Sequence, residues 1–239
     1  MFARLGSPAR SALSMLLWSA ALVVAILLVP LVLQAVILLF KLEIPVNAPV
    51  LILTLGLIGS VLMGVFFVGI ARLAKRRVTW SDVGLGRPLT WKDIGFGFAG
   101  FVIYIIASSI GMYLFAQLGG DVGQEQEFGL GSLFGVERLY AMIIFVIAVP
   151  IIEEIIFRGI LYTKLRKSGV HMIAASVAVS VLFGIAHGQW NVAVDVFMMS
   201  MVACYLREYT GVIWPGIIIH IVKNFIGFYF TFVLLQGMP

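Results

Sequence analysis

Long stretches of apolar residues, separated by short polar segments, occupy most of the chain. A helix needs about 20 consecutive apolar residues to cross the hydrocarbon core of a bilayer. Helices are predicted for these stretches because a chain in lipid must satisfy its backbone hydrogen bonds internally. The sequence therefore predicts an all-α fold, a polytopic transmembrane helical bundle in which residues 1–239 form a single membrane domain. Seven spans are predicted, at about 12–40, 48–72, 94–117, 138–163, 170–187, 192–207 and 212–236.

The composition also indicates a membrane environment. Of the 239 residues, 62% are hydrophobic and 11% are charged, which leaves too little polar surface to cover a soluble protein of this size. The net charge is +5, but the basic residues lie in short clusters between apolar runs and indicate orientation. The predicted partner is therefore the lipid bilayer and not nucleic acid. The single cysteine, Cys204, allows no intrachain disulfide and no cysteine-based metal site.

Charge is distributed unevenly between the predicted loops. Acidic residues predominate in the loop after the third span, whereas the loops after the second and fourth spans are basic. The positive-inside rule places both basic loops in the cytoplasm, so the prediction is a multi-pass protein of the cell membrane with a cytoplasmic N-terminus. Residues 78–91 predict an interfacial elbow, because Trp80 and Trp91 flank glycines and a proline.

Three ionisable residues, Glu153, Glu154 and Arg158, lie inside the fourth predicted span. A charge at membrane depth costs at least about 2.5 kcal/mol on insertion scales, so each one calls for a reason. Positions four apart share a helix face, so Glu154 is predicted to pair with Arg158, whereas Glu153 points about 100° away. A carboxylate without a fixed counter-ion can take a proton from water. Glu153 is therefore the predicted base, and Pro150 is predicted to loosen the helix beside it.

Other polar residues in the spans complete a candidate active site. His187 ends the fifth predicted span, and His220 and Asn224 lie four apart, on one face of the last span. Amide hydrolysis needs a base that activates water and donors that hold the oxyanion. We predict that His187 orients the water and that His220 and Asn224 donate to the oxyanion. The third histidine, His171, is predicted to lie at headgroup level.

At these residues the sequence resembles a known family, the CAAX-processing and bacteriocin-processing (CPBP, or Abi) membrane proteases, which include the type II CAAX prenyl endopeptidases. The resemblance covers about 138–228, and it implies a helical catalytic core and a hydrolase that cleaves a protein or peptide substrate. It also implies that Glu153 activates water and that His187, His220 and Asn224 complete the site, with Glu154 and Arg158 in support. The motifs, in order, are Glu153-Glu154-x-x-x-Arg158, Phe183-x-x-x-His187 and His220-x-x-x-Asn224.

Lys223 departs from the pattern of the family. It lies beside Asn224 and three residues from His220, on an otherwise apolar predicted helix. Three interpretations are open: the side chain reaches the membrane surface, pairs with Asp195, or binds a carboxylate of the substrate.

Other functions use the same polar residues. Glu153, His187 and His220 are a candidate zinc site with one position left for water; against it, the His-Glu-x-x-His spacing of zinc peptidases is absent. No cofactor is predicted, and zinc is the alternative. A non-catalytic membrane scaffold or immunity protein would keep the cluster for packing or partner binding. A transporter would use it to relay protons, but the sequence shows no inverted repeat.

Overall fold

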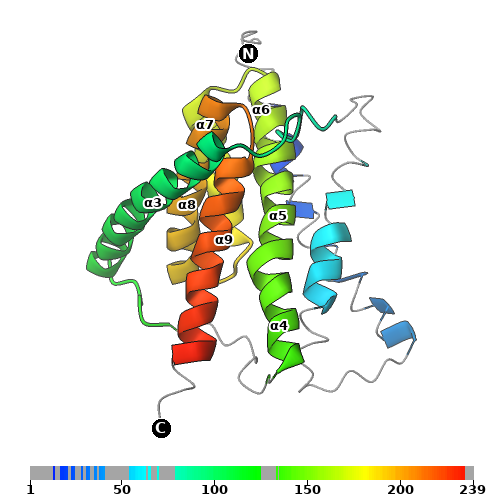
Figure 1. Ribbon diagram of the computed structural model, residues 1–239. Coiled ribbons are helices and arrows are strands. Elements are labelled where there is room, and N and C mark those ends of the chain that lie inside the picture. The colour runs from blue at the N-terminus through cyan, green and yellow to red at the C-terminus, as the bar shows by residue number, and fades with distance from the viewer. Residues whose placement is uncertain are drawn as a thin grey trace.

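The computed structural model describes residues 79–124, 133 and 135–234, together with scattered positions between 13 and 69. The regular structure of these residues is helical and includes no strand, so the predicted all-α class is confirmed. The predicted spans at 12–40 and 48–72 fall mainly outside the described residues. In chain order (Figure 1), the helices are α3 (Trp91–Gln117), α4 (Val136–Met142), η2 (Ile143–Ala148), α5 (Val149–Glu154), η3 (Ile155–Tyr162), α6 (Thr163–Lys167), α7 (Met172–Ile185), α8 (Trp190–Thr210), α9 (Trp214–Tyr229) and η4 (Phe230–Leu234).

Helices α4 to α6 and the π-helical segments η2 and η3 form one continuous element, Val136–Lys167, called the long helix below. Within the described residues, three helices are long and apolar enough to cross a membrane: α3, the long helix and Trp214–Phe232. In contrast, α7 has 14 residues, a length of about 21 Å, which is short of a hydrocarbon core of about 30 Å. The number of spans, seven, therefore stays a prediction.

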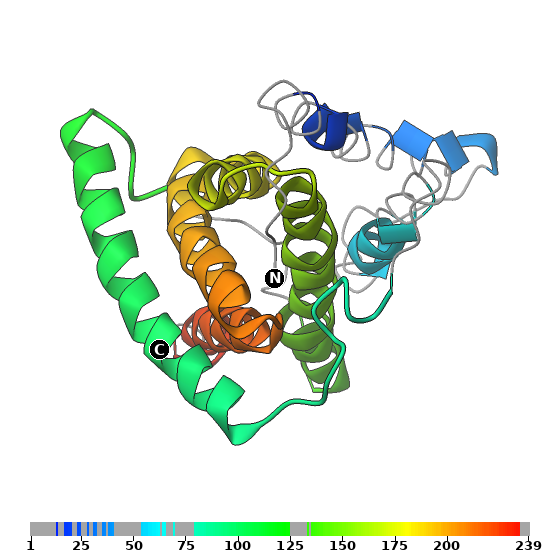
Figure 2. The same ribbon diagram turned by 90° about the horizontal axis from the view of Figure 1, so that it is seen from above.

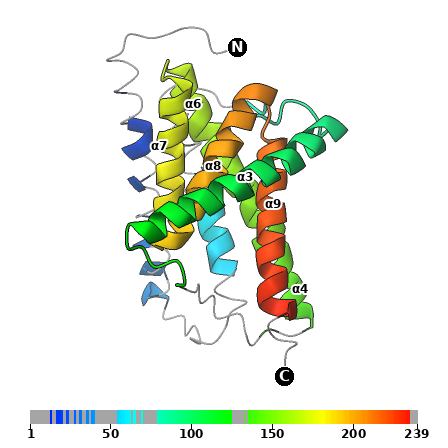
Figure 3. The ribbon, with the colours of Figure 1, turned by 90° about the vertical axis from the view of Figure 1, so that its left-hand side faces the viewer.

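Helices α7 and α8 form an antiparallel hairpin that does not reach the far end of the bundle. The connecting turn at 186–189 includes Gly188, whose φ of 71° suits a residue without a side chain. In Figures 1 and 3 this turn lies well above the lower ends of α4 and α9. The last residues of the second predicted motif therefore lie partway along the bundle, beside the middle of its longer helices.

Helix α3 crosses the outside of α8 and α9 obliquely (Figures 2 and 3). A Cβ added at Gly97 would lie 2.6 Å from Ile218 Cβ of α9, so the glycine lets the backbone of α3 approach that helix closely. The opposite face of α3 is apolar and exposed, as expected of a face turned to lipid. The buried face is made of residues three or four apart: Asp93, Gly97, Gly100, Tyr104, Ser108 and Gly111.

The predicted elbow is a non-helical segment, 79–90, that covers one end of the bundle. Its Gly84 has a φ of 83°, and its carbonyl accepts a hydrogen bond from Ile213 N at 3.1 Å. The carbonyl of Arg87 accepts a second bond from Trp214 Nε1 at 3.0 Å. The elbow therefore fixes the start of α9, from which the last motif extends into the bundle.

Candidate active site

The structure brings the first and last motifs into direct contact. Glu153 and Glu154 lie at the end of α5, and His220 lies on the facing side of α9. The imidazole of His220 sits between the two carboxylates, with Nδ1 3.3 Å from Glu154 Oε1 and Nε2 3.5 Å from Glu153 Oε2. Two neighbouring glutamates of one helix thus contact the two nitrogens of one histidine.

Glu154 is enclosed and paired, as predicted from the spacing. Its Oε1 accepts a hydrogen bond from Arg158 Nη1 at 2.7 Å, and both side chains are 0% exposed. The guanidinium also lies over the ring of Phe183, 4.5 Å from its centroid, in a cation–π contact. A Cβ at Gly216 would lie 2.7 Å from Glu154 Oε2, so this glycine makes room for the carboxylate. The charge of Glu154 is therefore committed to Arg158.

Glu153 differs from Glu154 in exposure and in hydrogen bonding. Its side chain is 20% exposed, and it accepts no hydrogen bond from any other described residue. Its nearest polar contact is the longer one to His220. The carboxylate therefore keeps its capacity to accept protons and hydrogen bonds from a small molecule in the site.

His187 lies just beyond the end of α7, in the short turn before α8. Its Nδ1 is 2.8 Å from the carbonyl oxygen of Phe183; since a carbonyl only accepts, Nδ1 carries the hydrogen and Nε2 is the free acceptor of the neutral ring. The ring of Phe183 packs edge-on against both histidines, with centroids 4.8 Å from His187 and 5.8 Å from His220. Phe183 thus sets the relative positions of the two rings, a role that the sequence analysis did not assign to it.

Asn224 forms a hydrogen bond with the backbone of the long helix. Its Nδ2 donates to the carbonyl oxygen of Phe145 at 2.9 Å. Phe145 lies in the π-helical segment η2, where Val149 N donates to the carbonyl five residues earlier. In this register the amide facing Phe145 O belongs to Pro150, which has no N–H. Pro150 therefore cannot donate to this carbonyl, which accepts from the side chain of Asn224, and no described residue accepts the second amide hydrogen of Asn224.

Lys223 forms an ion pair with Asp195 of α8, with Nζ 3.4 Å from Oδ2. One of the three interpretations of Lys223, pairing with Asp195, is therefore observed. Asp195 also accepts hydrogen bonds on Oδ1 from Tyr104 at 2.8 Å and from Ser108. Tyr104 and Ser108 were missed in the sequence, although their spacing of four on α3 was a usable signal.

The described residues contain no group of three histidine, cysteine or acidic side chains arranged to hold a metal ion. Glu153, His187 and His220, the residues of the zinc alternative, therefore do not form a three-ligand set in this arrangement. The tautomer of His187 does leave Nε2 as a potential ligand atom. Zinc thus stays a predicted alternative.

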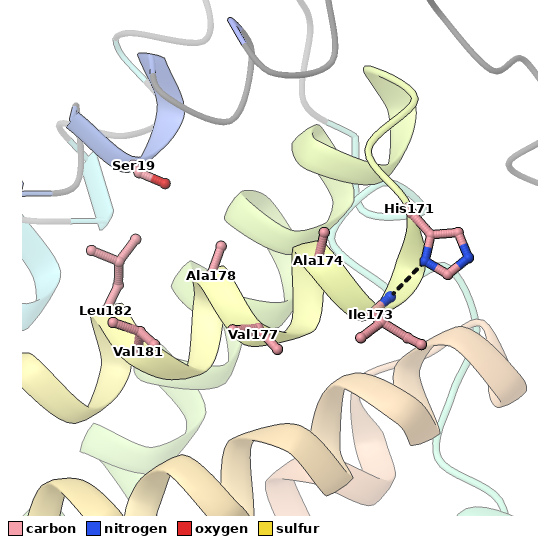
Figure 4. A pocket seen from close by; sticks show the side chains of 8 residues that line it. All are labelled: Ser19, His171, Ile173, Ala174, Val177, Ala178, Val181 and Leu182. Atoms are coloured by element: carbon pink, nitrogen blue, oxygen red, sulfur yellow. Dashed lines mark hydrogen bonds between the residues drawn. The ribbon is translucent and has the colours of Figure 1, made fainter. Parts of the chain in front are cut away.

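A groove lies on the outer face of α7 (Figure 4). It has a volume of about 750 Å³. His171 caps the start of α7 at its rim and accepts a hydrogen bond from Ile173 N. The groove is almost entirely apolar, and none of the candidate catalytic residues lines it. Its lining residues are Ser19, His171, Ile173, Ala174, Val177, Ala178, Val181 and Leu182.

Comparison with known proteins supports the resemblance in the motifs. Residues 135–226 match the family model described as type II CAAX prenyl endopeptidase Rce1-like. The chain is 32% identical over 145 residues to the "Putative membrane peptidase YdiL" of Bacillus subtilis (strain 168). The alignment covers 59% of this chain and 54% of that protein, so the chain matches about half the length of this relative. No solved structure matches the chain. The predicted family resemblance is thus confirmed over the segment that contains the motifs.

Proposed function

Because residues 135–226 are similar to Rce1-like, type II CAAX prenyl endopeptidases, we propose that this protein is an intramembrane endopeptidase of the glutamic type. It hydrolyses a peptide bond of a membrane-associated protein or peptide. The base is Glu153, and the reaction takes place between the long helix, the end of α7 and α9. The bilayer and the substrate are its proposed partners.

The observation that carries the proposal is the contrast between the paired glutamates. Glu154 is enclosed and holds Arg158 at 2.7 Å, whereas Glu153 is 20% exposed and accepts no hydrogen bond within the described part of the chain. A carboxylate that activates water must have an oxygen free to receive the proton. Glu153 meets this requirement, and the charge on Glu154 is neutralised beside it.

The proposed reaction has two steps. Glu153 takes a proton from water as the water oxygen bonds to the carbonyl carbon of the substrate, and the carbonyl oxygen becomes an oxyanion. We assign two donors to this oxyanion: the second amide hydrogen of Asn224, and Nε2–H of a protonated His220, whose Nδ1–H donates to Glu154. His187 Nε2 accepts a hydrogen bond from the other O–H of the water and so orients the water molecule. In the second step Glu153 returns its proton to the amide nitrogen, the carbon–nitrogen bond breaks, and a carboxylic acid and an amine leave.

The test is cleavage of a quenched fluorescent peptide library in detergent micelles or liposomes by the full chain. Glu153→Gln keeps the shape of the side chain but removes the base, so kcat is expected to fall by about 10²- to 10⁴-fold. Glu208→Gln is the matched control, because it makes the same change in a glutamate outside the site and is expected to keep kcat within about twofold. Purified variants are compared at equal folded concentration.

The alternatives give different results in the same assay. A non-catalytic scaffold predicts no cleavage by the wild type, and the proposal is then wrong. Equal cleavage by the wild type and Glu153→Gln contradicts the role of Glu153. Loss of cleavage with a zinc chelator, restored by added zinc, favours the metal-dependent alternative at Glu153, His187 and His220.

A further inference from the structure

Lys223 is a charged residue on an apolar helix, directly between two candidate catalytic residues in the sequence. A lysine at membrane depth is costly and is typically retained for function. Its charge acts electrostatically on Glu153, His187 and His220. Its side chain is 24% exposed, so it is not enclosed as that of Arg158 is.

The ion pair that holds Lys223 is a loose one. The distance of 3.4 Å between Nζ and Asp195 Oδ2 exceeds the 2.7–2.9 Å typical of strong charge-assisted bonds. Asp195 accepts two other hydrogen bonds on Oδ1, from the hydroxyls of Tyr104 and Ser108. Asp195 therefore stays hydrogen-bonded if Lys223 turns to another carboxylate, and this lowers the cost of the exchange.

The other cation beside the site cannot take this role. Arg158 is 0% exposed, donates to Glu154 and lies against the ring of Phe183. Among the described residues around Glu153 and His220, Lys223 is therefore the lysine or arginine with a partly exposed side chain. A substrate in contact with Glu153 and His220 can reach this positive charge.

From these contacts we propose that Lys223 is a substrate-binding residue that recognises a carboxylate of the substrate near the cleaved bond. On binding, the ammonium moves from Asp195 to that carboxylate, and Tyr104 and Ser108 keep Asp195 in place. The recognised group is either the C-terminal carboxylate of a short tail or the side chain of an aspartate or glutamate. This inference rests on the proposed peptidase function.

The test uses three quenched peptides with one cleavable core: a C-terminal amide, a C-terminal carboxylate, and a C-terminal amide with one asparagine replaced by aspartate. The wild type is expected to cleave one of the charged peptides with a kcat/KM about 10- to 100-fold above that of the neutral peptide. The charged peptide preferred identifies the source of the carboxylate. Lys223→Met is expected to lose the preference, mainly through KM, so that its kcat/KM values for the charged and neutral peptides become equal.

Two further variants separate binding from a structural role. Lys223→Arg keeps the charge and is expected to keep the preference. Asp195→Asn still accepts from Tyr104 and Ser108 but releases Lys223, so the preference is expected to stay or increase. If Lys223→Met and Asp195→Asn instead slow all three peptides equally, Lys223 only holds α8 and α9 together and the inference is overturned.

The wild type alone also decides between the two proposals. Equal kcat/KM for all three peptides overturns the role of Lys223 and leaves the peptidase function intact, even where Lys223→Met does not fold. Cleavage of none of the peptides, or of any other substrate, contradicts the peptidase function, and the inference fails with it.

Discussion

The long helix contributes to two clusters of polar and charged residues, and the clusters differ in how completely their hydrogen bonds are made. The end cluster, near the last turn of this helix, consists of Tyr162, Arg166 and Glu208. Arg166 donates to both oxygens of Glu208, at 2.7 and 3.0 Å, and the hydroxyl of Tyr162 donates to the same carboxylate at 2.9 Å. Every charged group of the end cluster is thus held by a partner in the bundle.

The inner cluster, Glu153, Glu154, Arg158 and His220, also pairs an arginine with a glutamate, but fewer of its hydrogen bonds are made. Among the described residues, Glu154 Oε2 and Arg158 Nε and Nη2 are buried without a hydrogen-bond partner. Unpaired buried polar groups are costly, and native proteins keep few of them. The pair of Arg166 with Glu208 of α8 has its hydrogen bonds made, whereas the pair of Glu154 and Arg158 within the long helix does not. In the inner cluster, unpaired polar atoms remain enclosed beside the partly exposed Glu153.

The largest effect on stability is expected from breaking the inner pair. Arg158→Met leaves the enclosed charge of Glu154 uncompensated and is expected to lower the free energy of unfolding by about 3–5 kcal/mol. Arg166→Met, the same substitution in the end cluster, is expected to cost about 1–2 kcal/mol, because Glu208 is partly exposed and keeps its bond from Tyr162. Unfolding in detergent, followed by circular dichroism during titration with SDS, measures both values.

A double variant checks the cause. Glu154→Gln together with Arg158→Met removes both charges, so part of the stability lost in Arg158→Met is expected to return. Equal losses for Arg158→Met and Arg166→Met would contradict the difference between the clusters.

A smaller effect, on activity rather than stability, is expected at Pro150. Pro150→Ala restores a backbone N–H that can donate to Phe145 O and so compete with Asn224. We expect kcat to fall about tenfold, the equivalent of one hydrogen bond in the transition state, while the free energy of unfolding stays the same or rises. Peptide cleavage and SDS titration measure the two quantities.

The double variant of Pro150→Ala and Asn224→Ala shows whether Pro150 and Asn224 both act through the carbonyl of Phe145. In that case the losses of Pro150→Ala and Asn224→Ala do not add in the double variant. An unchanged kcat in Pro150→Ala would show that the bond between Asn224 and Phe145 has no part in catalysis.

Much of the site could be predicted from spacing, because helical periodicity relates nearby residues. The pair of Glu154 and Arg158 followed from their separation of four, and the family resemblance followed from three such spacings. The contact of His220 with both glutamates could not be predicted from spacing. It depends on the depth at which α9 starts, and the elbow fixes this depth. The bond from Asn224 to Phe145 depends on a π-helical register that an apolar sequence does not reveal.

The ends of the described helices lie within about four residues of the predicted spans, but the depth of each helix in the bundle did not follow from the sequence pattern. The apolar run at 170–187 predicted a full span, but α7 ends at Ile185 and a short turn with a left-handed glycine follows. Hydropathy measures the preference for an apolar environment and does not locate the residue at which a helix ends. The position of His187 partway along the bundle is a consequence of the short length of α7, 14 residues.

The smallest effect is expected at the elbow, where Asp82 pairs with Lys167 of the long helix. Burial by itself raises the pKa of Asp82, but hydrogen bonds from Lys167 and Thr79 outweigh it, and the pKa lies below its ordinary value. A lowered carboxyl pKa stabilises the folded state above the unfolded pKa of about 4, and this stabilisation is lost as the pH falls through the folded pKa. Asp82→Asn is therefore expected to lower the free energy of unfolding at pH 7 by less than about 1 kcal/mol. SDS titrations of both proteins between pH 7 and pH 2 measure the difference. It should shrink below about pH 4 and vanish at the acid end, whereas a difference that is constant with pH would show that the charge of Asp82 has no part in it.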